Sequence, residues 1–400
     1  MHPAFRHLYN SQFTPERYEW YTRELERRLG TSFEFRLAET PAFLPDDFRD
    51  RVENAATAIV AQLSDRANIA KMKRAIPDRW NVPGMDALPN LTQVDFAVVE
   101  ENGTLVPKLI ELQGFPSLTA LQVMQRDVWS DALQTMPGLD IPWSCWFSGL
   151  DREGFLDLAQ RTIAGNNDPR EVVLLDIDPP SQKTNVDFAA TKILFDVDAV
   201  DPRSLKKRGR QLFRDNGMRV KRIYNRVVFD ELIRKKIETP FDYREELDVQ
   251  WAPHPNWYWT WSKYSLPFLD HPSVPKATFL SDLDRIPKNL SDYVLKPLFS
   301  FAGGGVNVDP QPSDIDVIPA AERHAWCIQE KIEYAPALRA VDGGLVKVEI
   351  RMMFLRPDDE TQPVLAQNLV RLSRGKMLGV DFNKEFTWVG SSIGLYPLGS

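Results

Sequence analysis

The stretch QVDFAVVEENGTLVPKLIELQGFPSL, residues 93–118, decides how the rest of the sequence is interpreted. Asp95 lies inside the apolar run 94–99, and Glu111 directly follows an apolar pair. The turn residues 101–103, Glu-Asn-Gly, predict that the two runs form a β-hairpin. Both acids then belong to one sheet, where an unpaired carboxylate costs free energy. Other groups must therefore compensate the charges of these two carboxylates.

Composition limits the class of protein and the kinds of partner that the chain can have. The 400 residues can form two or three packed units, and a hydrophobic content of 43% is enough for cores. The net charge of −7 gives no overall attraction to nucleic acid or to an anionic membrane surface. Cys145 and Cys327 lie far apart, which argues against a disulfide framework or a thiolate metal site, and Cys145 is expected to pack in a core.

The N-terminus has no apolar signal-peptide core, and no apolar run reaches membrane-spanning length. We therefore expect a cytoplasmic protein without a nucleic-acid or membrane partner. The basic segment 203–222 carries nine Lys or Arg but just one aromatic residue, Phe213. This composition favours a solvated face or the rim of an acidic-substrate site over a nucleic-acid surface.

Periodicity divides the chain into segments. Residues 1–90 carry apolar residues at helical spacing, and 118–133 is expected to be a helix after the hairpin. The composition turns polar near 149–168 and ends in a predicted linker, Gly165 to Pro169. From 171 to about 232 strands and helices alternate, which predicts a small doubly wound unit. This unit contains no G-x-G-x-x-G, so a dinucleotide site of that kind is not expected.

The stretch YVLKPLFSFAGGGVNV, residues 293–308, has the composition of a phosphate cradle. A strand delivers Lys296, and glycines 303–305 allow backbone N–H groups to approach phosphate oxygens. The alternative is a glycine-rich hairpin turn beside a surface lysine. The Walker form of the P-loop is absent.

Polar residues continue downstream. AWCIQEKIEY places Gln329 and Glu330 where they can contact an adenine or ribose, and VKVEIRMMF places Glu349 and Arg351 on one strand face. The last stretch, LVRLSRGKMLGVDFNKEFTWVGSS, adds further candidates: Arg371, Arg374, Lys376 and Asn383. Cations therefore cluster late in the chain, whereas the metal-type acids come early.

Together these motifs resemble the ATP-grasp superfamily, in which a carboxylate is joined to an amine or thiol through an acyl-phosphate. Lys296, the glycine loop, the Q-E-x-I segment ending at Ile332, and the strand arginine carry the resemblance. Because the acids precede Lys296, the order is similar to the circularly permuted branch, including the synthetase domain of glutathionylspermidine synthases. Two stretches support this branch: residues 125–129, QRDVW, and 222–227, RIYNRV.

The resemblance implies an α/β (α+β) fold: a circularly permuted ATP-grasp fold with an inserted Rossmann-like pre-ATP-grasp domain. The implied parts are a helical N-terminal region (1–90), a metal-binding part (91–148), a βαβ domain (149–250) and a nucleotide-binding part (251–400). The implied function is an ATP-dependent carboxylate–amine ligase whose partners are ATP, a carboxylate and an amine.

The resemblance also implies roles for residues. Mg²⁺ would be held by Asp95, Glu111 and Gln113, although the family usually has asparagine at the last position. Nucleotide binding would involve Lys263, Lys296, Gly303, Gly304, Gly305, Gln329, Glu330 and Ile332. Catalysis would involve Arg351, Arg371 and Asn383.

Simpler interpretations stand beside these roles. Arg351 would alternatively form an ion pair with Glu349 or another acid. Lys263 would alternatively be a surface lysine after a Trp-rich strand, whose tryptophans at 257, 259 and 261 share one face and form core or pocket wall. For the whole protein, the alternatives are a nucleotide-binding regulatory or interaction protein without turnover, and a phosphotransferase. The motifs contain no histidine, which weakens the phosphotransferase alternative.

Overall fold

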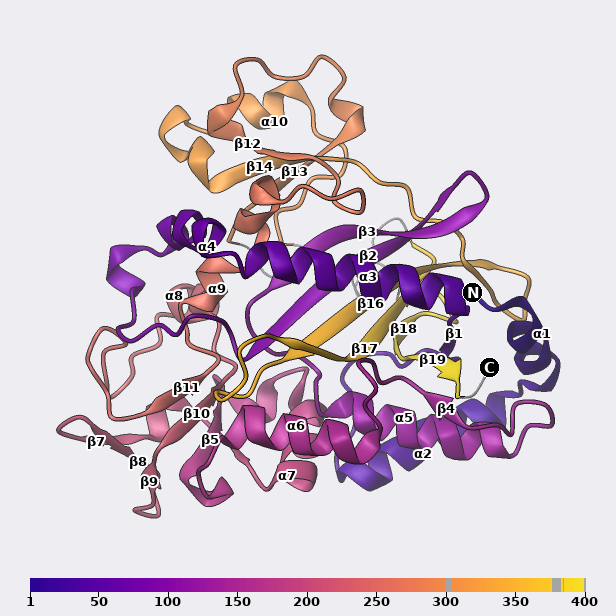
Figure 1. The fold of residues 1–400 in the computed structure, drawn as a ribbon, viewed down its shortest axis with the longest axis horizontal. Coiled ribbons are helices and arrows are strands. Elements are labelled where there is room, and N and C mark those ends of the chain that lie inside the picture. The colour runs from indigo at the N-terminus through magenta and orange to yellow at the C-terminus, as the bar shows by residue number, and fades with distance from the viewer. Residues whose placement is uncertain (300–303, 376–382, 384, 399–400) are drawn as a thin grey trace.

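A computed structural model of the chain describes residues 1–299, 304–375, 383 and 385–398. Its centre is an antiparallel sheet in the order β18-β17-β16-β2-β3 (Figure 1). These strands are Gly390–Ser392, Val364–Ser373, Leu345–Leu355, Leu91–Glu101 and Thr104–Gln113, and the short β15, Leu338–Arg339, pairs with β16. The sheet therefore joins the early hairpin to strands from the end of the chain.

The predicted β2–β3 hairpin is confirmed. Asn102 and Gly103 adopt positive φ values of 52° and 77°, as a two-residue turn with matching twist requires. One irregularity interrupts the ladder: Asp95 pairs with Glu111 and Phe96 with Leu109, so Ile110 is an extra residue on β3. This β-bulge lies directly beside the two acids that the sequence singles out.

The N-terminal helices are α1 (Pro3–Gln12), α2 (Pro15–Leu29), α3 (Asp46–Leu63) and α4 (Arg66–Met72). α2 shows why they form: Thr14 caps its first turn, proline stands at its first position, and Gly30 ends it in the left-handed conformation. Three short strands, β1 (Ala42–Phe43), β19 (Gly394–Pro397) and β4 (Trp143–Ser144), form a second sheet near both chain ends (Figure 1). These helices and the large sheet bury their apolar side chains in one shared core.

α5 (Leu121–Gln134) follows the hairpin as predicted, but the polar region after it is not an extended linker. Residues Arg152–Ala164 form the helix α6, whose N-terminus is capped by Asp151. Its surface is polar, yet Phe155, Leu158 and Ile163 recur at helical spacing and are buried. The predicted linker, Gly165 to Pro169, lies directly after α6 and reaches a 3₁₀ helix that begins at Pro169.

A four-stranded parallel sheet forms the middle of the chain, in the order β11-β10-β5-β6. Its strands are Gln250–Ala252, Arg222–Asn225, Val172–Leu175 and Asp198–Val200, with the helices α7 (Asn185–Phe195) and α8 (Phe229–Lys235). The parallel pairing agrees with the predicted alternation of strands and helices.

The basic segment forms a small antiparallel ribbon that projects from the parallel sheet (Figure 1). Its strands are β7 (Lys206–Arg208), β8 (Gln211–Phe213) and β9 (Arg219–Val220). Acids neutralise most of its cations, in the pairs Lys206–Asp215, Lys207–Glu245, Arg210–Glu246, Arg214–Asp198 and Lys221–Glu171. The ribbon is thus a mixed-charge surface rather than a continuous basic patch.

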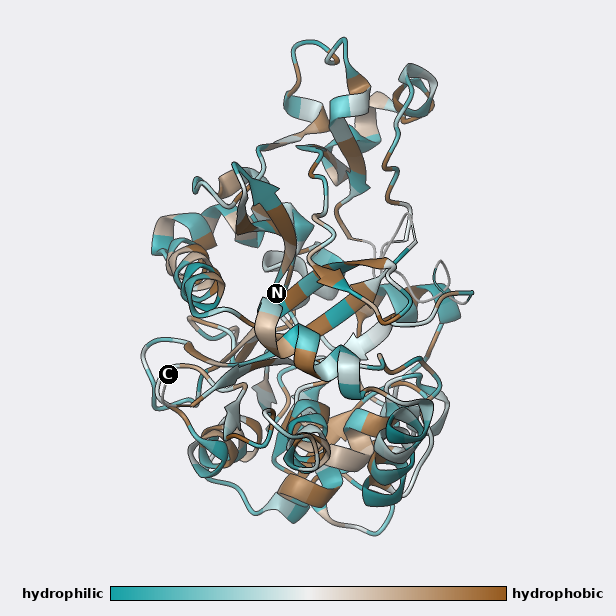
Figure 2. Ribbon diagram, turned by 90° about the vertical axis from the view of Figure 1, so that its right-hand side faces the viewer, coloured by the Kyte–Doolittle hydropathy of each residue, from teal (hydrophilic) through white to brown (hydrophobic). Residues whose placement is uncertain are grey.

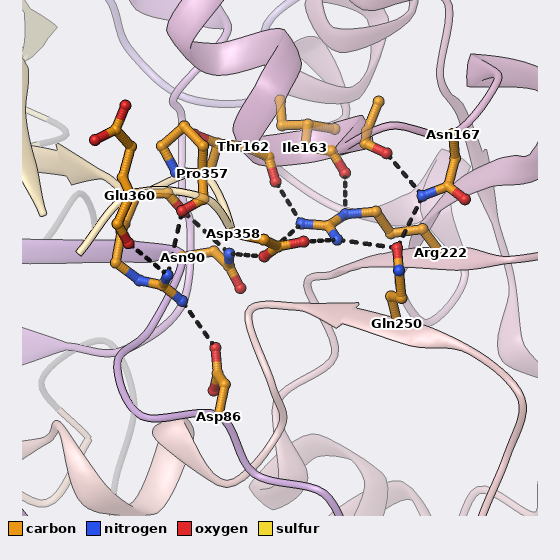
Figure 3. A network of polar contacts seen from close by, with 12 residues as sticks. Asp86, Asn90, Thr162, Ile163, Asn167, Arg222, Gln250, Pro357, Asp358 and Glu360 are labelled. Carbon is orange, nitrogen blue, oxygen red and sulfur yellow. Dashed lines mark hydrogen bonds and ion pairs between the residues drawn. The ribbon is translucent and has the colours of Figure 1, made fainter. Parts of the chain in front are cut away.

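A polar network fastens the parallel sheet to the large one (Figure 3). Arg222 of β10 is fully buried and donates to the backbone oxygens of Thr162 and Ile163, both at 2.9 Å. It also pairs with Asp358, in the turn between β16 and β17, at 2.6 Å. Asn90, just before β2, donates to the same Asp358 at 2.8 Å. One arginine therefore joins β10, the end of α6 and the β16–β17 turn.

A third, smaller unit contains the sheet β12-β14-β13 and the helix α10 (Pro312–Asp316), and has its own small core. The strands are Ala277–Phe279, Trp326–Glu330 and Tyr293–Pro297. Figures 1 and 2 show this unit set above the rest of the molecule. None of the described helices has the length and apolar character needed to cross a membrane.

The Trp-rich segment differs from its prediction. Trp257–Thr260 form the short helix α9, and Lys263–Phe268 form a 3₁₀ helix, so there is no strand here. Trp257 and Trp261 join the main core, whereas Trp259 stacks on Phe229 in the core beside the parallel sheet. Tryptophans at every second residue are typical of a strand face. Here the segment is helical, so the indole rings pack in two different cores.

Candidate functional site

The large sheet has one apolar face and one face with charged residues. Alternate residues of β16 enter the main hydrophobic core: Val346, Val348, Ile350, Met352 and Phe354. By the two-residue period of a strand, Glu349 and Arg351 lie on the opposite face. Figure 2 shows the resulting alternation of hydrophobic and hydrophilic residues along the central strands.

The strand register concentrates charge on that second face. Asp95 stands opposite Glu111 on one side and opposite Arg351 on the other. Glu349 stands opposite Arg371. The charged residues thus form a cluster across β3, β2, β16 and β17.

Asp95 lies at the centre of the cluster and is 1% exposed. Arg351 Nε and Nη2 donate to its two oxygens, each at 2.6 Å, and Arg371 also donates to Oδ2. Burial alone would raise the pKa of Asp95, but the two guanidinium groups outweigh it and hold the pKa below its usual value. The expected metal ligand and the expected catalytic arginine are therefore partners of each other.

Glu349 is the second acid of the cluster. Arg371 Nη2 pairs with its Oε1, and the hydroxyl of Tyr334 lies 3.4 Å from its Oε2. Burial raises the pKa of Glu349; Arg371 opposes this shift, and the nearby charge of Asp95 adds to it. Arg371 thus bridges two carboxylates on neighbouring strands.

The bulge of β3 anchors Lys296. Its Nζ donates to the backbone oxygen of Ile110, the bulged residue, at 3.1 Å, and to Gln329 Oε1 at 2.6 Å. β13 and β14 are paired neighbours, so they deliver Lys296 and Gln329 together. Burial lowers the pKa of Lys296 to about 8. The small sheet therefore contributes a buried cation next to Glu111.

Lys263 approaches Glu111 from the Trp-rich segment. Its Nζ lies 2.8 Å from Glu111 Oε1, and its side chain is 4% exposed. Ser262 caps the 3₁₀ helix that begins at Lys263. The backbone N–H of Gly114 donates to Trp261 O at 2.8 Å, which holds this helix against the end of β3. Lys263 is therefore a buried member of the site and not a surface lysine.

Gln113 lies at the end of β3, beside Glu111. It is buried, and its Oε1 has no hydrogen-bond partner among the described residues. A cavity of about 20 Å³ opens here, and its lining includes Glu111, Gln113, Lys263 and Phe299. As bounded by the described residues, this cavity has room for about one water molecule.

The glycine loop returns beside β13. Leu295 and Asn307 exchange two backbone hydrogen bonds of 2.9 Å, which close the connection between them. Gly305 has φ +72°, and an added Cβ would lie 3.0 Å from Pro297, so glycine is favoured there. Gly304 is exposed. Gly303 lies outside the described residues.

Some of the other predicted residues belong to the charged cluster, and others lie outside it. Gln329 belongs to the cluster through Lys296, whereas Glu330 is exposed and accepts from the backbone N–H of Lys276 at 3.0 Å. Ile332 is half-buried in the segment after β14. Asn383 is buried and holds a turn: its Oδ1 accepts from Ser373, Arg374 and Gly375.

Sequence reasoning treated Glu349 merely as an alternative partner for Arg351 and gave Tyr334 no role. Glu349 was detectable, because it stands two residues before Arg351 on a strand. Tyr334 lies in an irregular segment that reaches the sheet where Ala335 donates to Val98 O at 2.9 Å. No local pattern predicts that contact.

The residues implied for Mg²⁺ do not fit a protein-held divalent cation in this arrangement. Both oxygens of Asp95 accept from guanidinium groups, and Glu111 pairs with Lys263. Among the described residues, no group of three or more acidic, histidine or cysteine side chains is placed to hold a metal ion. Gln113 Oε1 is buried without a hydrogen-bond partner among the described residues.

Comparison with known proteins finds a similar fold in a solved structure. No family model matches the chain, and no curated protein matches it. A glutathione synthetase like-effector, GSS30, from Globodera pallida in its apo form is similar in structure, with a TM-score of 0.56 and 12% identity. The similarity covers 97% of this chain and 99% of that one. At this identity the likeness shows the fold alone: a mixed α/β fold related to that of a glutathione synthetase-like protein.

Proposed function

We propose that the chain is an ATP-dependent carboxylate–amine ligase with an ATP-grasp fold in circularly permuted order. The observation that carries the proposal is the meeting of Lys263 and Lys296 at the end of β3, beside Glu111. Buried lysines at one strand end provide charge for a polyphosphate. The glutathione synthetase-like neighbour supports a reaction that forms a C–N bond.

The permuted order is supported by strand pairing. The β2–β3 hairpin comes early in the chain but pairs with β16, from near its end. Lys296 comes from a separate small sheet and reaches the bulge of that hairpin. In the proposed assignment, the large sheet is the acid-bearing half, the small sheet is the nucleotide-binding half, and the parallel sheet is the inserted pre-ATP-grasp domain.

The proposed reaction has two steps. A carboxylate oxygen of the substrate forms a bond to the γ-phosphorus of ATP, and the bond to the ADP oxygen breaks. The amine nitrogen then attacks the acyl carbon, phosphate leaves, and the amine loses a proton as the amide forms. Lys263 and Lys296 would position and neutralise the phosphates, which is the main protein contribution to phosphoryl transfer.

Arg371 is suited to meet an anionic group of a substrate. Its side chain is 37% exposed, so it reaches solvent from a cluster whose other members are largely buried. The cavity at Gln113 admits about one water molecule, so nucleotide entry would require the small sheet to move away from β3.

A screen for ADP release tests this proposal. The protein would be given ATP with pairs of amines and carboxylates, drawn from amino acids, short peptides, polyamines and dicarboxylates. The products would be identified by mass spectrometry. We expect that one pair of substrates leads to ADP release and amide formation. The rates of ADP release and amide formation should both fall at least tenfold in Lys296→Met. ATP binding without ADP release for any pair would instead favour a regulatory nucleotide-binding protein, a candidate that the internal pairing of the acids also supports.

A further inference from the structure

We infer that Arg371 supplies, within the cluster, the positive charge that a protein-held divalent cation would otherwise supply, so that a nucleoside triphosphate binds without such a cation. This inference rests on the proposed function and specifies how its site is charged. It departs from the metal set that the sequence resemblance implies. The observations that carry it are the position of Arg371, the partial exposure of its side chain and the charge balance around it.

The position is that of a bridging cation. Arg371 contacts Asp95 on β2 and Glu349 on β16, so one guanidinium neutralises acids from two strands. Asp95 already receives two hydrogen bonds from Arg351. A second arginine is therefore not required to satisfy Asp95, which leaves the exposed side of Arg371 for another anion.

Arg371 is only partly buried. Its side chain is 37% exposed, although its Nε is buried and makes no hydrogen bond among the described residues. Arg351, by comparison, has a side chain that is 5% exposed. Arg351 thus holds the sheet from a buried position, whereas part of the Arg371 side chain is open to a ligand.

The charge balance favours an anion. Among the described residues of the cluster, three carboxylates, on Asp95, Glu111 and Glu349, face four cations, on Lys263, Lys296, Arg351 and Arg371. A site for Mg²⁺ normally offers free carboxylate oxygens. A cluster with surplus positive charge instead attracts phosphate or carboxylate groups.

The first experiment measures ATP binding by calorimetry, in Mg²⁺ and in EDTA. For the wild type we expect dissociation constants within about threefold of each other. Arg371→Ala should bind at least tenfold more weakly in EDTA and recover in Mg²⁺, whereas Arg371→Lys should keep metal-free binding because it keeps the charge. Wild-type binding that requires Mg²⁺, or equal metal-free affinity in Arg371→Ala, would overturn the inference.

A matched control is Arg161→Ala. Arg161 also pairs with acids, namely Asp157, Asp359 and Glu360, and its side chain is 38% exposed, but it lies on α6. Its loss should leave ATP affinity in EDTA unchanged. A similar loss in both variants would mean that the effect is general and not specific to the cluster, which contradicts the inference.

The second experiment needs no nucleotide. Free Mn²⁺ is measured by electron paramagnetic resonance as it is added to each protein. The wild type should bind no Mn²⁺ at submillimolar concentration, whereas Arg371→Ala should gain one site that disappears in Arg371→Ala combined with Asp95→Asn. If the wild type has an Mn²⁺ site that Asp95→Asn removes, the inference is refuted, whether or not the protein binds ATP. Absence of ATP binding would by itself refute the proposed function.

Discussion

Lys296 shows how burial sets the chemistry of a single side chain in this molecule. It is buried between the bulge oxygen of Ile110 and the amide oxygen of Gln329, two neutral acceptors. Neutral partners compensate the charge less than a carboxylate would, so burial lowers the pKa of Lys296 to about 8. The sequence identified this lysine through its strand and the glycines after it, but not the two neutral acceptors of its Nζ.

The lowered pKa predicts how ATP affinity depends on pH. Below about pH 8 Lys296 is charged and attracts the phosphates, and above it the lysine becomes neutral. Affinity should therefore fall as pH rises through 8, by up to about tenfold, a typical value for one charge-assisted contact. Calorimetry from pH 6.5 to 9.5 measures this fall.

Two variants test whether the fall in ATP affinity with pH is due to Lys296. Lys296→Met should bind weakly at every pH and show no fall near pH 8. Lys288→Met, at an exposed lysine of the same small unit, should retain the wild-type profile. A wild-type affinity independent of pH would remove Lys296 from the phosphate site.

Gln113 gives a second test at this scale. Its buried Oε1 has no partner among the described residues, so Gln113→Leu removes an unsatisfied polar atom. The free energy of unfolding in urea should stay the same or rise by about 1 kcal/mol, while turnover should fall because the cavity beside Glu111 and Lys263 loses an amide oxygen. Gln113→Asn keeps the oxygen and should keep turnover; a large loss of stability in Gln113→Leu would show that the oxygen is bonded.

At the scale of elements, the β3–α9 contact decides whether Lys263 reaches Glu111. The Cβ of an alanine at position 114 would lie 2.4 Å from the backbone oxygen of Trp257. Gly114 therefore permits the close approach of α9 to the end of β3. The sequence could not predict this, because the Trp spacing indicated a strand and the contact joins distant segments.

Gly114→Ala should push α9 and the following 3₁₀ helix away from β3. We expect a loss of about 1–3 kcal/mol in the free energy of unfolding, as for other overpacked sites, with weaker ATP binding because Lys263 moves. Urea unfolding and calorimetry measure the two effects. Gly154→Ala, in the first turn of α6, is the control and should change neither by much. Wild-type stability in Gly114→Ala would disprove the close packing.

Other elements were predictable where the local signal was strong. The β2–β3 hairpin follows from Asn102-Gly103 between apolar runs, and the parallel unit follows from alternating strands and helices. α6 was missed because its exposed face makes the segment polar on average. The ion pairs of Asp95 depend on strands from both ends of the chain, so local patterns predicted the residues but not their partners.

At the scale of the whole molecule, Arg222 and Asp358 connect the parallel sheet to the large sheet (Figure 3). Arg222→Leu would leave the backbone oxygens of Thr162 and Ile163 without this donor. Each buried unsatisfied group costs about 1–3 kcal/mol, so urea unfolding should show a loss of at least about 2 kcal/mol. Asp358→Asn should cost less, because Asp358 is half exposed. Equal losses, or none, would contradict the network's anchoring role.

The central claim, that a carboxylate is activated by phosphorylation, is tested most directly with a substrate carboxylate labelled with ¹⁸O. The measurement is the mass of the inorganic phosphate released as the amide forms. An acyl-phosphate transfers one carboxylate oxygen to phosphate, so we predict one ¹⁸O in each phosphate per amide. Unlabelled phosphate alongside labelled amide and ADP would contradict the proposed ligase mechanism.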